Sequence, residues 1–276
     1  MGSDINHNDN IAGSSAVCAA IALAPYSEAL TVVDAVRNLN SFCKSAPYLA
    51  LAVTEVARIF NNLASAAAGG TDANITLPYT AEVAPQGWSA VKLEVKGLKG
   101  GHSGIQIGFQ RGNANRLLCR LLLHTEQEWL LSSIDGGGLR NAIPREAQAV
   151  LLVKDMEAFK AEAKAYEKTL QSEFENIEDS IAVLVEEVAY PTEIIPAEVA
   201  VKLVKAVVGA PNGVVKMSVE MEGLVQTSTN LARVVSNGET VKIQCLLRSS
   251  VSSEKVALAE AIKGVFELAD AEVELS

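Results

Sequence analysis

The sequence has 276 residues, of which 49% are hydrophobic and 20% are charged, and its formal net charge is −10 at pH 7. This composition is ordinary for a folded globular protein and argues against a disordered chain. The negative charge, with no cluster of basic residues, excludes nucleic acid and anionic membrane surfaces as partners, and no apolar run is long enough to span a membrane.

Residues 1–72 differ from the rest of the chain because alanine dominates them. Their apolar segments predict buried helices. Gly69-Gly70 is a natural break in the chain. We therefore expect a small, Ala-rich helical domain at 1–72 and a larger domain at 73–276.

The larger domain shows strand and helix patterns in two successive rounds. Apolar and charged residues alternate at 89–97, as in a half-buried strand, and longer segments show helical spacing. The predicted strands are 89–97, 130–135, 147–153, 180–188, 213–219, 225–235, 240–248 and 271–275, and the predicted helices are 113–128, 155–174, 196–208 and 253–268. The pattern predicts an α+β fold of two tandem split β-α-β (ferredoxin-like) units, with helices against a mainly antiparallel sheet.

Local signals support these elements. Asp155 is a good N-cap for the helix at 155–174, and Asn237-Gly238 predicts a hairpin turn. One apolar stripe of that helix is predicted to lie in the core: Met156, Phe159, Ala163, Tyr166, Leu170 and Phe174.

The four cysteines are far apart and show no C-x-x-C spacing. They are Cys18, Cys43, Cys119 and Cys245. Such cysteines are typical of reduced core residues and predict a cytoplasmic protein. The polar amino terminus does not resemble a secretory signal.

A glycine-rich stretch, KGLKGGHSG at 96–104, lies between a predicted strand and a predicted helix. It places His102 on a connection, where a side chain can reach a ligand. The flanking glycines let the backbone approach a substrate closely. The simpler interpretation is a tight turn that carries a solvated histidine.

A second polar loop, GGGLRNAIPRE at 136–146, favours the interpretation in which His102 reaches a ligand. With GNANRLL at 112–118, the two loops resemble the lid domain of the aminoacyl-histidine dipeptidases. These enzymes are the Xaa-His, carnosine-cleaving branch of the zinc-dependent aminoacylases and carboxypeptidases. Further motifs in the family's order extend the similarity over about residues 69–276.

The resemblance implies roles for three residues. His102 matches the lid histidine that hydrogen-bonds the scissile carbonyl and helps to hold the oxyanion. Asn141 and Arg248 match residues that hold the far end of the substrate. The residue types suit these roles, because an imidazole can donate to developing negative charge and a guanidinium can grip a carboxylate. The alternative for Arg248 is a strand-end arginine that pairs with a surface carboxylate.

Residues 1–72 resemble a shortened remnant of the family's α/β metallopeptidase domain. Asp9 matches a metal-bridging aspartate and Glu55 matches the general base, but Val56 stands where a metal-binding glutamate belongs. His7-x-Asp9 has the letters of an H-x-D motif without the apolar strand that would place it. Because a dinuclear zinc site needs roughly five to six ligands, we expect zinc in the complete family enzyme and none bound by this chain.

Three other motifs are set aside. Glu186-Glu187 follows an apolar strand and is interpreted as a pair of solvated strand-end glutamates. Ile105 stands where a serine-hydrolase elbow needs its second glycine. The sequence contains no P-loop and no dinucleotide fingerprint.

The sequence therefore predicts part of a metal-dependent dipeptidase, a hydrolase that cleaves Xaa-His dipeptides. This chain would supply the substrate-covering lid and the dimer contacts, and would be inactive alone. The expected partners are a dipeptide substrate and a second copy of the chain. The alternative is a non-catalytic binding or oligomerisation protein derived from the lid.

Overall fold

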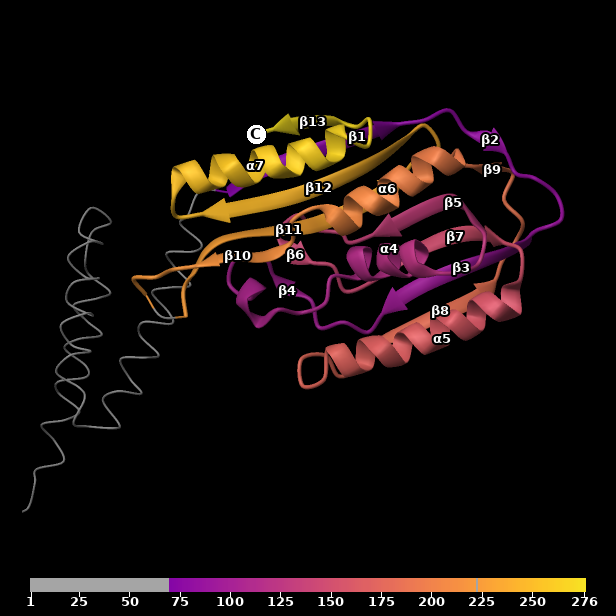
Figure 1. The fold of residues 1–276 in the computed structure, drawn as a ribbon, viewed down its shortest axis with the longest axis horizontal. Helices are drawn as coiled ribbons and strands as arrows, with labels where there is room; N and C mark the ends of the chain where they lie inside the picture. The colour runs from indigo at the N-terminus through magenta and orange to yellow at the C-terminus, as the bar shows by residue number, and fades with distance from the viewer. Residues whose placement is uncertain (1–69, 222) are drawn as a thin grey trace, which may run out of the picture. The chain divides into compact units, whose positions relative to one another are not determined.

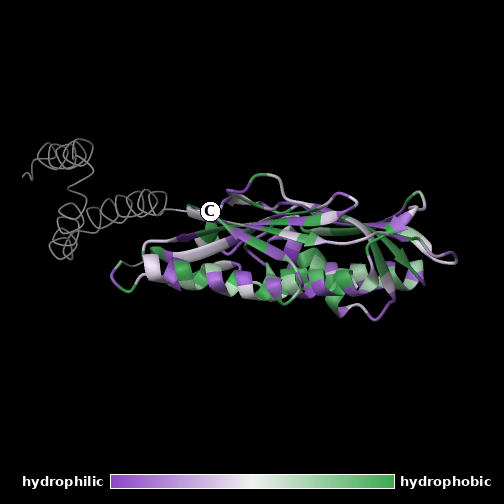
Figure 2. Cartoon of the chain, turned by 90° about the horizontal axis from the view of Figure 1, so that it is seen from above, coloured by the Kyte–Doolittle hydropathy of each residue, from purple (hydrophilic) through white to green (hydrophobic). Residues whose placement is uncertain are grey.

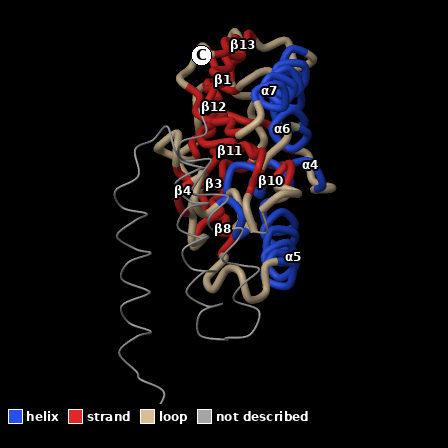
Figure 3. Tube along the Cα trace, turned by 90° about the vertical axis from the view of Figure 1, so that its left-hand side faces the viewer, coloured by secondary structure: helices blue, strands red, loops and turns tan. Residues whose placement is uncertain are grey.

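The computed structural model describes residues 70–221 and 223–276, which form two layers. One layer is a large antiparallel sheet, and the other consists of helices on one face of it (Figure 1; Figure 3). The helices are α4 (Ala114–His124), α5 (Met156–Glu173), α6 (Ala197–Gly209), α7 (Ser252–Glu267) and the short 3-10 helix η3 (Ile107–Phe109). No helix in this part of the chain is long and apolar enough to cross a membrane. The predicted layer of helices against a mainly antiparallel sheet is confirmed.

Nine strands of the described residues form the large sheet. They are β1 (Gly70–Pro78), β3 (Ser89–Lys96), β5 (Trp129–Gly136), β7 (Ala147–Val153), β8 (Ala182–Glu187), β10 (Gly213–Met217), β11 (Val225–Ser236), β12 (Thr240–Ser249) and β13 (Glu272–Leu275). Their order is β13-β1-β12-β11-β5-β7-β3-β8, and β10 pairs with β11. Two short antiparallel pairs lie outside this sheet: β2 (Glu82–Val83) with β9 (Glu193–Ile194), and β4 (Gly101–His102) with β6 (Ala142–Ile143).

The first strand, β1, is absent from the predicted elements. It pairs with β12 over its whole length and with β13 on its other side. Its buried residues are Ala73, Ile75 and Leu77, which alternate with more exposed ones as a one-sided strand requires. Because β1 begins at Gly70, the sheet includes residues 70–72, which the sequence analysis assigns to the smaller domain.

The two halves of the sheet meet at one short contact. There β11 pairs with β5 through Val234 opposite Gly136 and Val235 opposite Asp135. The polar loop at 136–146 leaves β5 at this point, so it starts at the seam between the halves. In the view from above, the strands and the helices form separate rows (Figure 2). Buried hydrophobic residues from both rows form one core cluster.

Helix α4 ends at His124, earlier than the predicted residue 128, because the chain turns toward α5. Thr125 takes an extended conformation as the C-cap. Its hydroxyl group donates to the carboxylate of Glu162 on α5, and Gln127 Nε2 donates to the same carboxylate at 2.8 Å. A side chain that is distant in sequence therefore ends this helix.

Helix α5 confirms its predicted cap and core stripe. The Asp155 carboxylate accepts the Ala158 N–H at 2.9 Å. The stripe packs in or against the core through Met156, Phe159, Ala163, Tyr166, Leu170 and Phe174. Glu167 on the same helix is also buried, which the charge pattern does not predict; its carboxylate accepts the Val183 N–H at 2.9 Å and pairs with Lys164.

The cysteine and hairpin predictions are confirmed where the structure describes them. Cys119 and Cys245 are buried free thiols, and burial raises the pKa of each to about 12. Cys18 and Cys43 lie outside the described residues. Asn237 begins the turn between β11 and β12, where its N–H donates to the Thr240 carbonyl at 3.1 Å.

Candidate functional site

The two loops singled out in the sequence lie side by side because β4 pairs with β6. His102 faces Ala142 in this pair. Next to it, the Ser103 N–H donates to the Asn141 carbonyl at 2.8 Å. The exposed Asn141 is thereby held beside His102, although the two residues are far apart in sequence.

The turn after His102 fixes its ring. Nδ1 accepts hydrogen bonds from the Gly104 N–H at 3.1 Å and from the Ile105 N–H at 3.2 Å. Gln106 holds the backbone, because its Oε1 accepts the His102 N–H and its own N–H donates to the His102 carbonyl, both at 2.9 Å. With Nδ1 acting as an acceptor, this bonding assigns the proton of the neutral ring to Nε2.

Arg248 at the end of β12 lies against the same turn. A β carbon added to Gly104 would be 3.1 Å from Arg248 Nε and 3.2 Å from His102 Cε1, so the glycine separates the two side chains. Burial and the nearby guanidinium lower the pKa of His102 below its ordinary value of 6.5. Burial and the positive charge of Arg140, which itself pairs with Asp72, lower the pKa of Arg248.

Further polar atoms surround this group and were missed by the sequence analysis. The Asn230 amide on β11 donates from Nδ2 to the Ala142 carbonyl at 2.8 Å. Asn230 Oδ1 and Ser103 Oγ are buried and have no hydrogen-bond partner among the described residues. The sequence does contain a signal for Asn230, because Thr227-Ser228-Thr229-Asn230 is an uninterrupted run of polar residues inside a buried strand.

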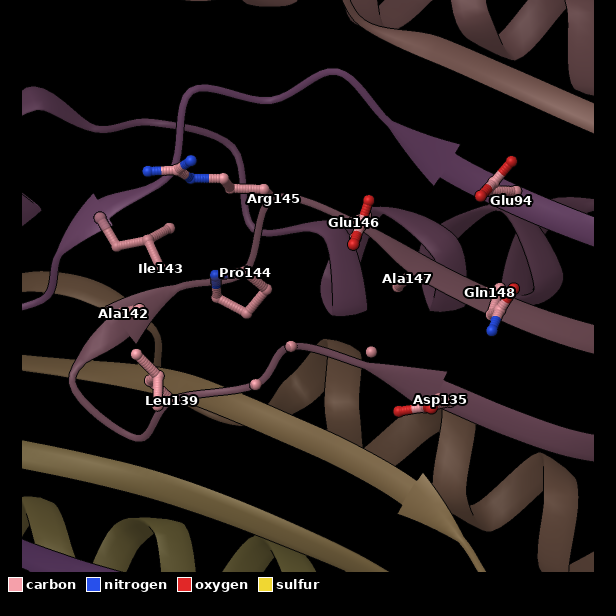
Figure 4. A pocket seen from close by; sticks show the side chains of 13 residues that line it. Glu94, Asp135, Leu139, Ala142, Ile143, Pro144, Arg145, Glu146, Ala147 and Gln148 are labelled. Carbon is pink, nitrogen blue, oxygen red and sulfur yellow. The ribbon is translucent and has the colours of Figure 1, made fainter.

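A separate cavity of about 560 Å³ is lined by residues of the polar loop and of the strands next to it (Figure 4). Acidic side chains from three segments line it, namely Glu94 on β3, Asp135 on β5 and Glu146 before β7. In the register, Gln148 of β7 lies between Glu94 and Asp135. His102, Asn141 and Arg248 do not line this cavity.

The zinc implied by the family resemblance has no fitting donor set within residues 70–221 and 223–276. No three His, Cys, Asp or Glu side chains of that part of the chain lie together so that they could hold a metal ion. Asp9 and Glu55, the candidate metal ligand and general base, lie outside the described residues. We therefore derive no reaction step through a metal from the described residues.

Glu186 and Glu187 lie at the end of the edge strand β8 and are exposed. Glu186 pairs with Lys92 of the neighbouring strand at 3.1 Å. This agrees with their interpretation as strand-end glutamates.

Comparison with known proteins gives two related results. Residues 91–180 match the M20 peptidase dimerisation domain. The cytosol non-specific dipeptidase of Escherichia coli (strain K12) is 37% identical over 211 residues, which cover 75% of this chain and 44% of that enzyme.

A solved structure agrees with the sequence match. The aminoacylhistidine dipeptidase of Vibrio alginolyticus has a TM-score of 0.74 and 36% identity, and the match covers 75% of this chain and 43% of that one. This chain thus spans less than half the length of both relatives. The resemblance to aminoacyl-histidine dipeptidases is confirmed, with residues 91–180 matching the dimerisation domain of the M20 peptidases.

Proposed function

We propose that this chain supplies the substrate-covering and dimer-forming part of an M20-type dipeptidase acting on Xaa-His dipeptides. The observation that carries the proposal is the bonding of His102. Two backbone N–H groups occupy its Nδ1, which leaves Nε2–H as a donor beside Arg248. Such a donor suits the carbonyl oxygen of a scissile peptide bond as it gains negative charge.

Charge supports the same assignment. The lowered pKa of His102 keeps its imidazole neutral at pH 7, so Nε2 carries a proton while Nδ1 remains an acceptor. The planar Arg248 guanidinium can grip a substrate carboxylate through two parallel hydrogen bonds, and the Asn141 amide can add a third. In this proposal, His102 acts at the scissile carbonyl while Arg248 and Asn141 hold the carboxylate end.

The proposal assigns the remaining chemistry to the complete enzyme. Zinc bound there would activate the attacking water. Glu55 matches the general base, and Asp9 matches a metal ligand, in the domain that we place at 1–72. The lid and dimerisation domain would occupy 73–276, and the location would be cytoplasmic.

The finer description of the fold is part of this proposal. The order β5-β7-β3-β8, with α4 and α5 as the crossing helices, is that of one split β-α-β unit. The order β13-β1-β12-β11, with α6 and α7, is that of a second unit. Because β1 provides a strand of the second unit, the first unit lies between β1 and α6 in the chain.

A non-catalytic binding or oligomerisation protein derived from the lid is the second candidate. The observation that favours it is Val56, which stands where the family resemblance implies a metal-binding glutamate. Dipeptide turnover by a complete enzyme that carries residues 70–276 as its lid separates the two candidates. Turnover would exclude the non-catalytic candidate, and its absence in a folded enzyme would favour that candidate.

Dipeptide binding tests the proposed site directly. Titration of the ¹⁵N-labelled chain with Gly-His should shift the resonances of His102, Asn141 and Arg248. The C-terminal amide of Gly-His lacks the carboxylate, and Arg248→Met lacks the guanidinium, so each should weaken binding about tenfold or more, as expected for a lost charge-assisted hydrogen bond. Equal affinity for the acid and the amide, or shifts confined to the acidic cavity, would contradict the proposal.

A further inference from the structure

Glu178, in the segment between α5 and β8, is a buried carboxylate that the proposed reaction does not use. Only 9% of the residue is exposed. Its Oε2 accepts the Lys99 N–H at 2.7 Å, and its Oε1 accepts the Gly112 N–H at 2.9 Å. Burial of an unpaired carboxylate is costly, whereas charge-assisted hydrogen bonds to backbone N–H groups offset that cost.

Lys99 and Gly112 lie at the two ends of the loop that carries His102. One side chain therefore closes the loop from outside. The segment around Glu178 also lies directly against the start of the loop. A β carbon on Gly97 would be 1.9 Å from the Ser180 carbonyl oxygen, and Gly97 has a φ of +82°.

Contacts within the loop also stabilise the conformation of the backbone around His102. Gln106 bonds both the N–H and the carbonyl of His102, and Arg111 donates to the Gly100 carbonyl. The loop is thus braced internally, and Glu178 joins its two ends to each other. Loss of that closure would loosen the turn whose N–H groups hold the ring of His102.

We propose that Glu178 is a positioning residue, whose carboxylate closes the loop from Lys99 to Gly112 and so holds the imidazole of His102 with Nε2 directed away from the turn. The consequence of this positioning for substrate binding rests on the proposed function. The effect on the ring is a property of the chain itself and can be measured without substrate.

Glu178→Gln changes the bonding with little change in size. The amide oxygen of glutamine can accept one backbone N–H, but its NH₂ group would face the other N–H, so one end of the loop loses its partner. Asp179→Asn is the matched control. Asp179 is exposed, and its side chain pairs with Lys99 Nζ at 3.0 Å. Such surface pairs contribute about 0–1 kcal/mol to stability.

The readout is the ring of His102, observed in long-range ¹H–¹⁵N spectra of the full chain and assigned by comparison with His102→Gln. The wild type should show an unprotonated Nδ1 and a protonated Nε2. In Glu178→Gln the two nitrogen shifts should move toward the average of an exposed histidine, and the titration midpoint should rise toward 6.5. Asp179→Asn should match the wild type. A wild-type His102 spectrum in folded Glu178→Gln would overturn the proposal.

Amide hydrogen exchange in the wild type covers the case in which Glu178→Gln does not fold. The Lys99 and Gly112 N–H groups should both exchange more slowly than in the unfolded chain, and unprotected exchange at either would also overturn the proposal. A changed His102 ring in Glu178→Gln, with no Gly-His binding to the wild type, would leave this inference standing and remove the proposed function. Gly-His binding to the wild type, together with an unchanged His102 ring in Glu178→Gln, would remove this inference and leave the proposed function standing.

Discussion

The ring of His102 is fixed by contacts only two and three residues along the chain. The N–H groups of Gly104 and Ile105 both reach Nδ1, which is possible because the chain turns back at once. The glycine-rich sequence was sufficient to predict that His102 lies on the connection between a strand and a helix. It could not predict which nitrogen stays available, because that depends on distances within the turn.

We expect His102 to titrate below 6.5, because burial and the Arg248 guanidinium both oppose its protonation. Since the folded pKa is lower than the unfolded one, His102 contributes stability above pH 6.5 that is lost as the pH falls through the folded value. NMR titration of the ring measures the midpoint. Arg248→Met should raise it, whereas Arg120→Met, which removes a cation paired with Glu173, should leave it unchanged. A wild-type midpoint at 6.5 would contradict this assignment.

Gly137 and Gly138, which follow β5, should differ in how well they tolerate substitution by alanine. A β carbon on Gly137 would lie 1.9 Å from the Ala232 carbonyl oxygen, and Gly137 has a φ of +75°. Strain and overpacking together should make Gly137→Ala cost about 2–4 kcal/mol. Gly138→Ala is the control, because nothing lies within 4 Å of its added carbon, and it should cost less than about 0.5 kcal/mol. Urea unfolding that gave equal losses for the two variants would exclude this account of the loop.

At the scale of elements, periodicity predicted every long helix within residues 70–276 that the structure describes, and most strands of the large sheet. The one strand missed, β1, carries a usable signal, since Ala73, Ile75 and Leu77 alternate with polar residues. The predicted domain boundary was placed inside this strand. The early end of α4 could not be predicted locally, because Glu162 of another helix draws the chain away. Local sequence patterns also could not predict that β1 pairs with the carboxyl-terminal strands, because those strands are distant in sequence.

Asn113 and Asp155, the side-chain N-caps of two of the described helices, should differ in their effect on stability. Asp155 caps α5 at the surface, so Asp155→Ala should cost about 1 kcal/mol. Asn113 caps α4 and is also buried, where its Nδ2 donates to the Leu231 carbonyl at 2.9 Å. Asn113→Ala should therefore cost about 2–4 kcal/mol, because it removes a cap and also leaves a buried carbonyl unpaired. Chemical denaturation compares them, and equal costs would show that the bond to Leu231 contributes little.

For the molecule as a whole, the choice of residues in the candidate site rests on the family resemblance and not on physical patterns. His102, Asn141 and Arg248 lie in matching motifs, and the structure places His102 beside the other two. Glu178 and Asn230 support them from segments distant in sequence. The polar run that contains Asn230 was a usable signal, whereas nothing in the sequence around Glu178 indicates its contacts with the loop.

The proposed homodimer should form through β10. Within residues 70–221 and 223–276, β8, β10 and β13 each have an unpaired edge. Glutamates on β8 and β13 would meet like charges across a two-fold axis, whereas β10 exposes Val215 and Met217.

Light scattering at micromolar concentration should therefore give twice the chain mass for the wild type. Val215→Glu should shift the equilibrium toward monomer, because it places a charge at the apolar contact. Val83→Glu changes a valine that is 85% exposed on β2 and should remain dimeric. A monomeric wild type, or equal dissociation of both variants, would count against this interface.

Turnover by a chimaeric enzyme tests the central claim, that His102 acts on the substrate. Residues 70–276 would replace the matching segment of the Escherichia coli dipeptidase, to which this chain is 37% identical over 211 residues. We predict that the chimaera hydrolyses dipeptides and that His102→Ala lowers its kcat by about 100-fold or more, as loss of an oxyanion donor does. Its Tm should barely move, because a loop substitution of this kind costs less than about 0.5 kcal/mol. Equal kcat values with and without His102, or unfolding on substitution with the kcat of the folded fraction intact, would show instead that His102 is only a structural turn residue.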